Sequence, residues 1–456
     1  MSAPISTETP KTRCAVFVPV VGYSSTQRMN AIDVRPRNNG ISHIRAPHAQ
    51  LEEACGLAEA INLDIVLTDI TRVATFKPAT LYGGGKVDEM HGALKMHEVD
   101  VTLVDHPLTP VQQRNLERAW NTKVLDRTGM ILEIFGARAQ TKEGRLQVDL
   151  AALRYQRGRL VRSWTHLERQ RGGAGFLGGP GETQIESDRR ELQMKIERLE
   201  KQLEEVRRTR SLHRKQRKKR EIPIIAFVGY TNAGKSTLFN KMTKANVLAK
   251  DLLFATLDPT LRRIELPQGT VAVMSDTVGF ISNLPTDLVA AFRSTLEEVL
   301  EADVIVHVRD ISHDDTHAQA DDVVGVLQDL GLDINDSDEL SLAGTHYMEV
   351  WNKVDLLSPE RQDELKALID ERDVSPTCIT SATTGEGIED LLVHLEACLN
   401  SGQKIRTVTL KDAALGKMHF AYELGTVLDR KNTDEGHVIL KVRSARWHEL
   451  NHHLDL

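Results

Sequence analysis

The segment Gly229-Tyr-Thr-Asn-Ala-Gly-Lys-Ser236 matches the pattern G-x-x-x-x-G-K-[ST] at every fixed position. An apolar, β-branched run precedes it at 222–228, and residues 237–242 have the pattern of a helix start. Glycines let backbone N–H groups wrap a phosphate, and the N-terminus of the following helix adds partial positive charge. Strand, loop and helix together predict a phosphate-binding loop. In it, Lys235 reaches the β- and γ-phosphates and Ser236 offers its hydroxyl to Mg²⁺.

A second motif lies in the loop expected after that helix. Residues 254–258 read Phe-Ala-Thr-Leu-Asp. A threonine here in a nucleotide switch senses Mg²⁺ and the γ-phosphate through its hydroxyl and backbone. We expect Thr256 to be this threonine, with Thr260 as the alternative, because the sequence does not fix the geometry of the loop.

A third motif, Asp276-Thr-Val-Gly279, ends an apolar strand predicted over 271–275. It has the form D-x-x-G. We expect Asp276 to bind Mg²⁺ through a water molecule and the N–H of Gly279 to contact the γ-phosphate. The tetrapeptide is common on its own, so its weight comes from its place after the phosphate-binding loop.

Two later motifs predict that the nucleotide carries guanine. Asn352-Lys-Val-Asp355 has the form N-K-x-D, and Asp355 can accept hydrogen bonds from guanine N1–H and the N2 amino group. Adenine lacks that donor pair, so a buried Asp355 would discriminate against it by about 10⁴-fold or more. We expect Asn352 to support the loop, the Lys353 stem to lie over the ring and the N–H of Ala382 to meet guanine O6.

Five motifs in one order predict a domain that binds and hydrolyses GTP. Phe280 follows the D-x-x-G motif, where many GTPases place a glutamine that orients the attacking water. Because phenylalanine cannot do that, we predict slow intrinsic hydrolysis that a partner stimulates. Asn232 could help hold K⁺ near the phosphates, as in some potassium-assisted GTPases.

The expected site falls into three sets. The catalytic residues are Lys235, Thr256 and Gly279. The metal ligands are Ser236 and Thr256. The nucleotide-binding residues are Gly229, Tyr230, Thr231, Asn232, Ala233, Gly234, Lys235, Ser236, Thr237, Phe254, Ala255, Thr256, Leu257, Asp258, Asp276, Thr277, Val278, Gly279, Asn352, Lys353, Val354, Asp355, Ser381, Ala382 and Thr383.

Composition limits the class of protein. The 456 residues carry a net charge of −7, so the whole chain is not a general polyanion binder. The four cysteines show neither paired nor metal-ligand spacing, so we expect reduced thiols in a cytoplasmic protein. No apolar run reaches the roughly 20 residues needed to cross a bilayer, although peripheral membrane association stays open. Residues 1–12 lack the apolar core of a secretory signal and are expected to be a disordered lead-in.

The N-terminal part, 13–140, alternates predicted strands and helices, which is typical of an α/β domain with a mainly parallel sheet. Thr109 and Pro110 have the pattern of a helix N-cap and first turn. The stretch Tyr82-Gly-Gly-Gly-Lys86 is either a second phosphate site or a flexible turn that leads into a helix.

A helical hairpin is predicted at 141–220. Apolar residues recur every seven positions on both sides of a glycine-rich stretch at 172–181, which we expect to be a non-helical tip between helices of roughly 25 residues. Arginines flank the tip, and a basic run follows at 207–220. The tip is a flexible connection or contacts an anionic partner, and the run is a solvated helix end or binds nucleic acid.

The remaining chain divides into the GTPase domain at 221–402 and a small α/β domain at 403–456. In the latter we expect strands at 407–410 and 438–442 and a helix at 446–453. The predicted class is therefore α/β throughout: an N-terminal α/β domain with a long helical hairpin, a central P-loop GTPase domain with a mostly parallel sheet, and a small C-terminal domain.

Several longer stretches resemble the HflX family of ribosome-associated GTPases over about 105–397. They are WTHLERQRGG (164–173), GPGETQIESDRR (179–190), GYTNAGKSTLFN (229–240), LFATLDPTLRRIELP (253–267), SDTVGFISNLP (275–285) and WNKVD (351–355). Phe280 fits the family pattern, whereas 82–86 departs from the family's more usual V-G-x-G-K turn.

The resemblance implies a bacterial GTPase that uses Mg²⁺, binds GTP and GDP, and associates with the rRNA of the large ribosomal subunit. We expect a monomer, because the heptads are satisfied within one hairpin. Family members split stalled or idle ribosomes under stress, with the N-terminal domain and hairpin near the peptidyl-transferase region. The alternative is a non-splitting RNA-binding or assembly factor whose attachment GTP regulates. ATP binding by the N-terminal domain is a further possibility.

Overall fold

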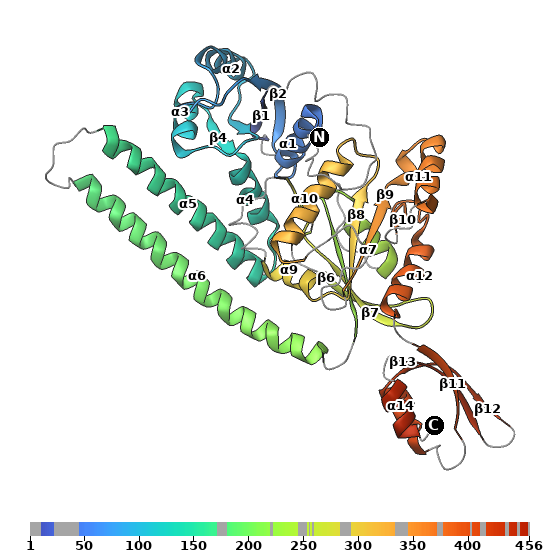
Figure 1. The fold of residues 1–456 in the computed structure, drawn as a ribbon. Coiled ribbons are helices and arrows are strands. Elements are labelled where there is room, and N and C mark those ends of the chain that lie inside the picture. The colour runs from blue at the N-terminus through green and yellow to red at the C-terminus, as the bar shows by residue number, and fades with distance from the viewer. Residues whose placement is uncertain are drawn as a thin grey trace, which may run out of the picture.

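Within the residues that it describes, the computed structural model has three sheets and a long helical hairpin (Figure 1). It describes residues 11–21, 45–170, 180–218, 222–244, 253–254, 256–257, 260–282, 293–332, 345–371, 377–401, 404–410, 416–433, 437–444 and 447–454. Residues 1–10 of the expected disordered lead-in lie outside these ranges. No helix in the described ranges is long and apolar enough to cross a membrane.

The N-terminal sheet, within the described residues, has the parallel strand order β2-β1-β3-β4. Four helices pack on its two faces. The strands are β1 (Arg13–Val21), β2 (Asp64–Val73), β3 (Val101–Val104) and β4 (Lys123–Asp126). The helices are α1 (Pro47–Glu59), α2 (Gly84–Met96), α3 (Pro110–Trp120) and α4 (Arg127–Arg138). The prediction of a parallel α/β unit is confirmed.

The two faces of β1 belong to different cores because strand side chains alternate. Val16 and Val18 pack in a cluster that contains Ile131 of α4, whereas Phe17 packs against Trp120 of α3 with ring centroids 5.6 Å apart. The predicted cap of α3 is confirmed as a capping box between Thr109 and Gln112, with proline in the first turn.

The hairpin consists of α5 (Lys142–Gln170) and α6 (Pro180–Lys218), and Figure 1 shows them running side by side. Leu146 and Leu150 of α5 form a buried seam with Ile196 and Leu203 of α6, as the seven-residue spacing predicts.

Two details of the hairpin differ from expectation. The helices have 29 and 39 residues, longer than the predicted length. The end of the supposed non-helical tip, Pro180 and Gly181, lies in the first turn of α6, because proline is compatible with the first helical position. Residues 171–179 lie outside the described ranges.

The central sheet, counted over the described residues, has the order β10-β9-β8-β5-β7-β6, and only β6 is antiparallel to its neighbour. The strands are β5 (Ile224–Gly229), β6 (Thr260–Glu265), β7 (Val271–Asp276), β8 (Val304–Asp310), β9 (His346–Asn352) and β10 (Thr377–Ile379). The helices are α7 (Lys235–Thr243), α9 (Arg293–Leu300), α10 (Thr316–Asp329), the 3₁₀ turn η2 (Val354–Leu356), α11 (Pro359–Glu371) and α12 (Ile388–Leu399). This arrangement places the ends of β5, β7 and β9 at one edge of the sheet.

The C-terminal sheet is antiparallel, with the order β11-β13-β12 among the described residues. Its elements are β11 (Lys404–Leu410), α13 (His419–Glu423), β12 (Thr426–Asn432), β13 (Val438–Ser444) and α14 (Trp447–Leu454). The sequence reading missed β12, which is an edge strand rich in charged residues with an irregular register between Val427 and Asp429.

Candidate nucleotide and metal site

The phosphate-binding loop connects the end of β5 to the start of α7. Its first glycine, Gly229, has φ 150°, and a Cβ there would lie 2.2 Å from the carbonyl oxygen of Val308. Gly234 has φ 92°, and its Cβ would lie 2.1 Å from Nδ2 of Asn352. Both positions therefore require glycine, for conformation and for space.

Lys235, the first residue of α7, is buried at 6% exposure. Its Nζ donates hydrogen bonds to the carbonyl oxygens of Gly229 at 3.0 Å and Tyr230 at 2.6 Å. Burial lowers the pKa of Lys235 to about 8, although the nearby carboxylate of Asp276 acts in the opposite direction. An anionic phosphate at this position would favour the charged form of the lysine.

Three oxygen-bearing side chains converge beside Lys235. Ser236 Oγ lies 2.8 Å from Thr256 Oγ1, and both hydroxyls contact Asp276 Oδ2, at 2.7 Å and 3.0 Å respectively. Burial raises the pKa of Asp276, while hydrogen bonds to its ionised form and the Lys235 charge oppose that rise. The second oxygen, Oδ1, is buried and has no hydrogen-bond partner among the described residues.

The two candidate switch threonines lie in different positions. Thr256 belongs to the hydroxyl and carboxylate group just described. Thr260 is the first residue of β6 and pairs with Asp276 through the sheet register. The convergence therefore favours Thr256 as the switch threonine. The flanking Ala255 and Asp258 lie outside the described residues.

The D-x-x-G segment lies across the phosphate-binding loop. Phe280 N donates to Gly229 O at 3.0 Å, and Thr231 N donates to Phe280 O at 2.7 Å. A Cβ on Gly279 would lie 2.9 Å from Thr231 Cα and 3.1 Å from Lys235 Nζ. Phe280 itself is 2% exposed and belongs to an apolar core, so its ring offers nothing to orient water.

Asn352 joins three of the predicted motifs. It is 1% exposed. Its Nδ2 donates to Ala233 O at 2.9 Å, and its Oδ1 accepts from Ala382 N at 3.0 Å. In this structure the N–H of Ala382, which was expected to meet guanine O6, donates to Asn352. The geometry agrees with the expected supporting role of Asn352.

The other base-recognition residues lie at the loop surface. Asp355 is exposed within η2, so its carboxylate is not already buried in this structure. A nucleotide would have to supply the burial on which discrimination depends. Lys353 has φ 65°, and its Nζ lies 2.8 Å from Asp310 Oδ2 at the end of β8. The sequence reading missed Asp310, although a carboxylate that ends an apolar strand was an available signal.

The remaining predicted residues divide by exposure. Asn232, Thr237 and Thr383 are exposed. Tyr230, Thr231, Ala233, Phe254, Leu257, Thr277, Val278, Val354 and Ser381 are buried. Of these, Thr277 donates its hydroxyl to Phe227 O at 2.5 Å.

The glycine-rich turn of the N-terminal domain leads directly into α2. Lys86 Nζ lies 3.2 Å from Asp69 Oδ2 and 2.8 Å from Glu89 Oε1. Because two carboxylates already neutralise this lysine, the geometry favours the interpretation of a turn over that of a second phosphate site.

Family models match the chain in four successive parts. They are described as GTP-binding GTPase N-terminal (48–136), GTP-binding GTPase middle region (138–217), 50S ribosome-binding GTPase (224–337) and HflX C-terminal domain (367–454).

The chain is similar to two curated relatives and, more distantly, to a solved structure. The chain is 51% identical to GTPase HflX of Magnetococcus marinus over 347 residues, 76% of each chain. It is 43% identical to GTPase HflX of Escherichia coli over 366 residues, 80% of this chain and 83% of that one. A GTP-binding protein from Sulfolobus solfataricus in complex with GDP has 21% identity and a TM-score of 0.43, covering 86% of this chain and 99% of that chain. On the identity and coverage of the curated relatives, this GTP-binding chain belongs to the HflX family of GTPases.

Proposed function

We propose that this protein binds GTP with Mg²⁺ and hydrolyses it. The observation that carries the proposal is the convergence of Ser236, Thr256 and Asp276 next to Lys235. Hydroxyl and carboxylate oxygens are the donors that Mg²⁺ prefers, and the buried Asp276 Oδ1 has no partner among the described residues. Ser236 and Thr256 would hold the ion, with Asp276 behind them through a water molecule. The ion would neutralise charge on the phosphates.

Hydrolysis by the isolated protein is proposed to be slow. At the position where many GTPases have a glutamine that orients the attacking water, this chain has the buried Phe280. Gly279 N–H and the Lys235 ammonium remain to stabilise negative charge on the γ-phosphate. A partner would have to complete the site. Asn232 is proposed to help hold K⁺, and an unchanged rate after replacement of K⁺ by Na⁺ would rule this out.

The proposed partner is the large ribosomal subunit. The match of residues 224–337 to a family described as 50S ribosome-binding GTPase supports it. The hairpin supports it too, because the 39 residues of α6 extend about 58 Å. The C-terminal part of α6 includes residues 207–218 of the basic run. Binding of rRNA phosphates by such a run weakens as salt rises.

We propose further that the GTP form splits stalled or idle ribosomes under stress and that hydrolysis releases the protein. The second candidate is a non-splitting RNA-binding or assembly factor. We expect a monomer, because the heptad seam is satisfied within one hairpin. All four cysteines lie in described residues and are unpaired, which supports a reducing compartment such as the cytoplasm.

The experiment that separates these candidates is sedimentation of intact ribosomes with the protein and GTP, a non-hydrolysable GTP analogue or GDP. Splitting predicts free subunits with both GTP and the analogue, with the protein retained on the large subunit by the analogue. Binding without loss of intact ribosomes would favour the non-splitting factor. Absence of binding in every nucleotide state would contradict the ribosome proposal.

A further inference from the structure

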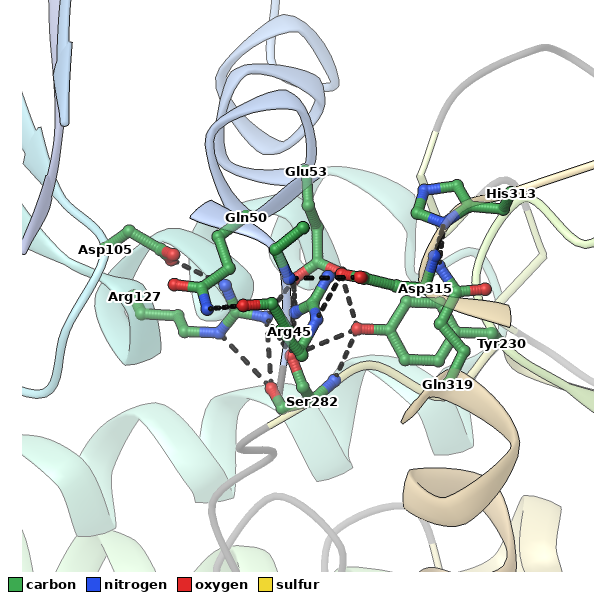
Figure 2. Close-up of polar contacts among 11 residues, drawn as sticks. Arg45, Gln50, Glu53, Asp105, Arg127, Tyr230, Ser282, His313, Asp315 and Gln319 are labelled. Carbon is green, nitrogen blue, oxygen red and sulfur yellow. Dashed lines mark hydrogen bonds and ion pairs between the residues drawn. The ribbon is translucent and has the colours of Figure 1, made fainter. Parts of the chain in front are cut away.

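A buried ionic cluster connects the N-terminal domain to the nucleotide domain (Figure 2). Glu53 of α1 is at its centre and receives hydrogen bonds from Arg127 at the start of α4 and from the hydroxyl of Tyr230. Arg45 binds Glu53 Oε2 at 3.0 Å and also contacts Asp315 Oδ2 at 3.3 Å. No motif in the sequence predicts this cluster, because its members come from distant segments.

The charges of the cluster are held away from water. The Arg127 and Glu53 side chains are 3% and 6% exposed, and Arg127 Nη1 lies 2.5 Å from Asp105 Oδ1. Burial alone would raise the pKa of Glu53. The charges of Arg127 and Arg45 outweigh this effect and lower the pKa to about 2. Buried ion pairs contribute little net stability compared with apolar packing, so their best-attested use is to specify one arrangement of the parts.

The cluster reaches the phosphate-binding loop through Tyr230. This residue follows Gly229, and its carbonyl oxygen accepts a hydrogen bond from Lys235 Nζ at 2.6 Å. Its hydroxyl binds Glu53 and also accepts from Ser282 N at 2.8 Å. One side chain therefore links the loop that holds the lysine to a carboxylate of the N-terminal domain.

The cluster also holds the segment after the D-x-x-G motif. The carbonyl oxygen of Ser282 accepts hydrogen bonds from Arg127 Nε at 3.2 Å and Nη2 at 3.0 Å. The Ser282 hydroxyl lies 2.5 Å from Arg45 Nη1. Ser282 is three residues from Gly279, whose N–H is proposed to contact the γ-phosphate. The position of that N–H is thus fixed partly by side chains of the N-terminal domain.

The segment 254–258, which contains the proposed switch threonine, also contacts the N-terminal domain. Phe254 packs edge-on against Phe135 of α4, with ring centroids 4.6 Å apart. The proposed switch residue Thr256 lies two positions further along the chain. Three features therefore occur together in this structure. The ionic cluster is formed, Thr256 contacts Ser236 and Asp276, and Gly279 lies against Lys235.

We propose that Glu53 is a positioning residue of the N-terminal domain that favours GTP over GDP. It does so by holding Tyr230 and Ser282 in the arrangement that presents Gly279 to a γ-phosphate. The inference rests on the proposed GTP site and adds a regulator to it. Because coupling between two sites is reciprocal, bound GTP should in turn strengthen docking of the N-terminal domain.

The test measures the affinities of the full chain for a non-hydrolysable GTP analogue and for GDP, both with Mg²⁺. Glu53→Gln keeps the shape of the side chain and removes its charge. We expect it to weaken binding of the GTP analogue at least about 5-fold more than binding of GDP, within the usual range of coupling between sites. Ser282→Ala, which removes one hydroxyl, should shift the ratio in the same direction by less.

Arg159→Gln is the matched control. Arg159 Nη2 also forms an ion pair, partly buried, with Asp126 Oδ2 at 2.9 Å, and it donates another hydrogen bond to Leu108 O. Both partners lie in the N-terminal domain, so this variant should leave the GTP-to-GDP affinity ratio unchanged. Partial recovery of the ratio in Glu53→Asp would support a role for the carboxylate charge.

The outcomes distinguish the inference from the proposed function. If the unmodified chain binds neither nucleotide, the proposed function fails. If it binds both, but Glu53→Gln and Ser282→Ala change the two affinities equally or not at all, the positioning role of Glu53 is overturned. Should Glu53→Gln not fold by circular dichroism, Ser282→Ala decides by the same ratio.

Discussion

Replacement of Asn352 by alanine tests whether one buried amide holds the phosphate and base motifs together. The change removes the hydrogen bonds to Ala233 O at 2.9 Å and from Ala382 N at 3.0 Å. Both backbone groups then lose a partner at a site where Asn352 is 1% exposed. A buried polar group left unpaired costs about 1–3 kcal/mol. The free-energy cost of leaving both groups unpaired, reduced where water takes the place of the amide, is therefore about 2–4 kcal/mol.

We expect most of this cost to appear as lost nucleotide affinity, because the two loops that Asn352 joins are those proposed to contact phosphate and base. A loss of 2–4 kcal/mol corresponds to an increase of about 30- to 1,000-fold in Kd. Titration calorimetry with GDP and Mg²⁺ measures it. Asn352→Asp keeps the hydrogen-bond acceptor and loses the donor. Its Kd for GDP should lie between those of the unmodified protein and Asn352→Ala. Asn115→Ala removes a similar but exposed hydrogen bond, to Ala79 O at 2.9 Å, and serves as the control.

An unchanged Kd for GDP in Asn352→Ala, with the protein folded, would refute this reasoning. It would mean that the two loops keep their geometry without the shared amide. A large fall in thermal stability with an unchanged Kd would place the cost in folding instead, and would equally contradict the expected role.

Three further predictions follow from the same geometry. Ser236→Ala removes a proposed Mg²⁺ ligand. It should raise the Mg²⁺ concentration needed for half-maximal GTP binding by about 10-fold or more, because a lost charge-assisted contact costs about 1.5–3 kcal/mol. Titration with Mg²⁺ measures this change. Gly229→Ala should destabilise the fold by several kcal/mol in urea unfolding, because its Cβ would lie 2.2 Å from Val308 O at φ 150°. The pKa of Glu53 is lowered from 4.5 to about 2. The stabilisation by its ionised form is therefore complete above the unfolded pKa and is lost as pH falls through the folded pKa. Glu53→Gln should therefore flatten the fall in unfolding free energy between pH 5 and pH 3, and an unchanged slope would contradict the assigned pKa.

Much of the fold could be predicted because its signals are local. The seven-residue spacing predicted the seam of Leu146 and Leu150 with Ile196 and Leu203, since each contact repeats a short sequence interval. The glycines at 229 and 234 were similarly readable, because the motif records positions where a side chain would collide. The polar edge strand β12 was missed because its stability comes from pairing with β13, which leaves little pattern in its own sequence.

The motifs predicted that Ser236, Thr256 and Asp276 lie near one another, as they do in the structure, but they did not predict how the neighbouring loops contact one another. The sequence could not show that Ala382 N donates to Asn352, or that Asp355 is exposed, because both depend on how separate loops pack. The ionic cluster was missed for a related reason. Glu53 and Ser282 are separated by 229 positions, and charged residues in a helix are usually read as a solvated face. Only the packing of the two domains identifies Glu53 as buried.

The most direct test of the account is GTP hydrolysis by the purified protein, alone and with large ribosomal subunits, at fixed K⁺ and salt. The account predicts slow turnover alone, because Phe280 cannot orient water, and strong stimulation by the subunit. Rapid turnover by the isolated protein would contradict the role assigned to Phe280. Absence of stimulation, with GTP binding intact, would contradict the ribosome as the partner that completes the site.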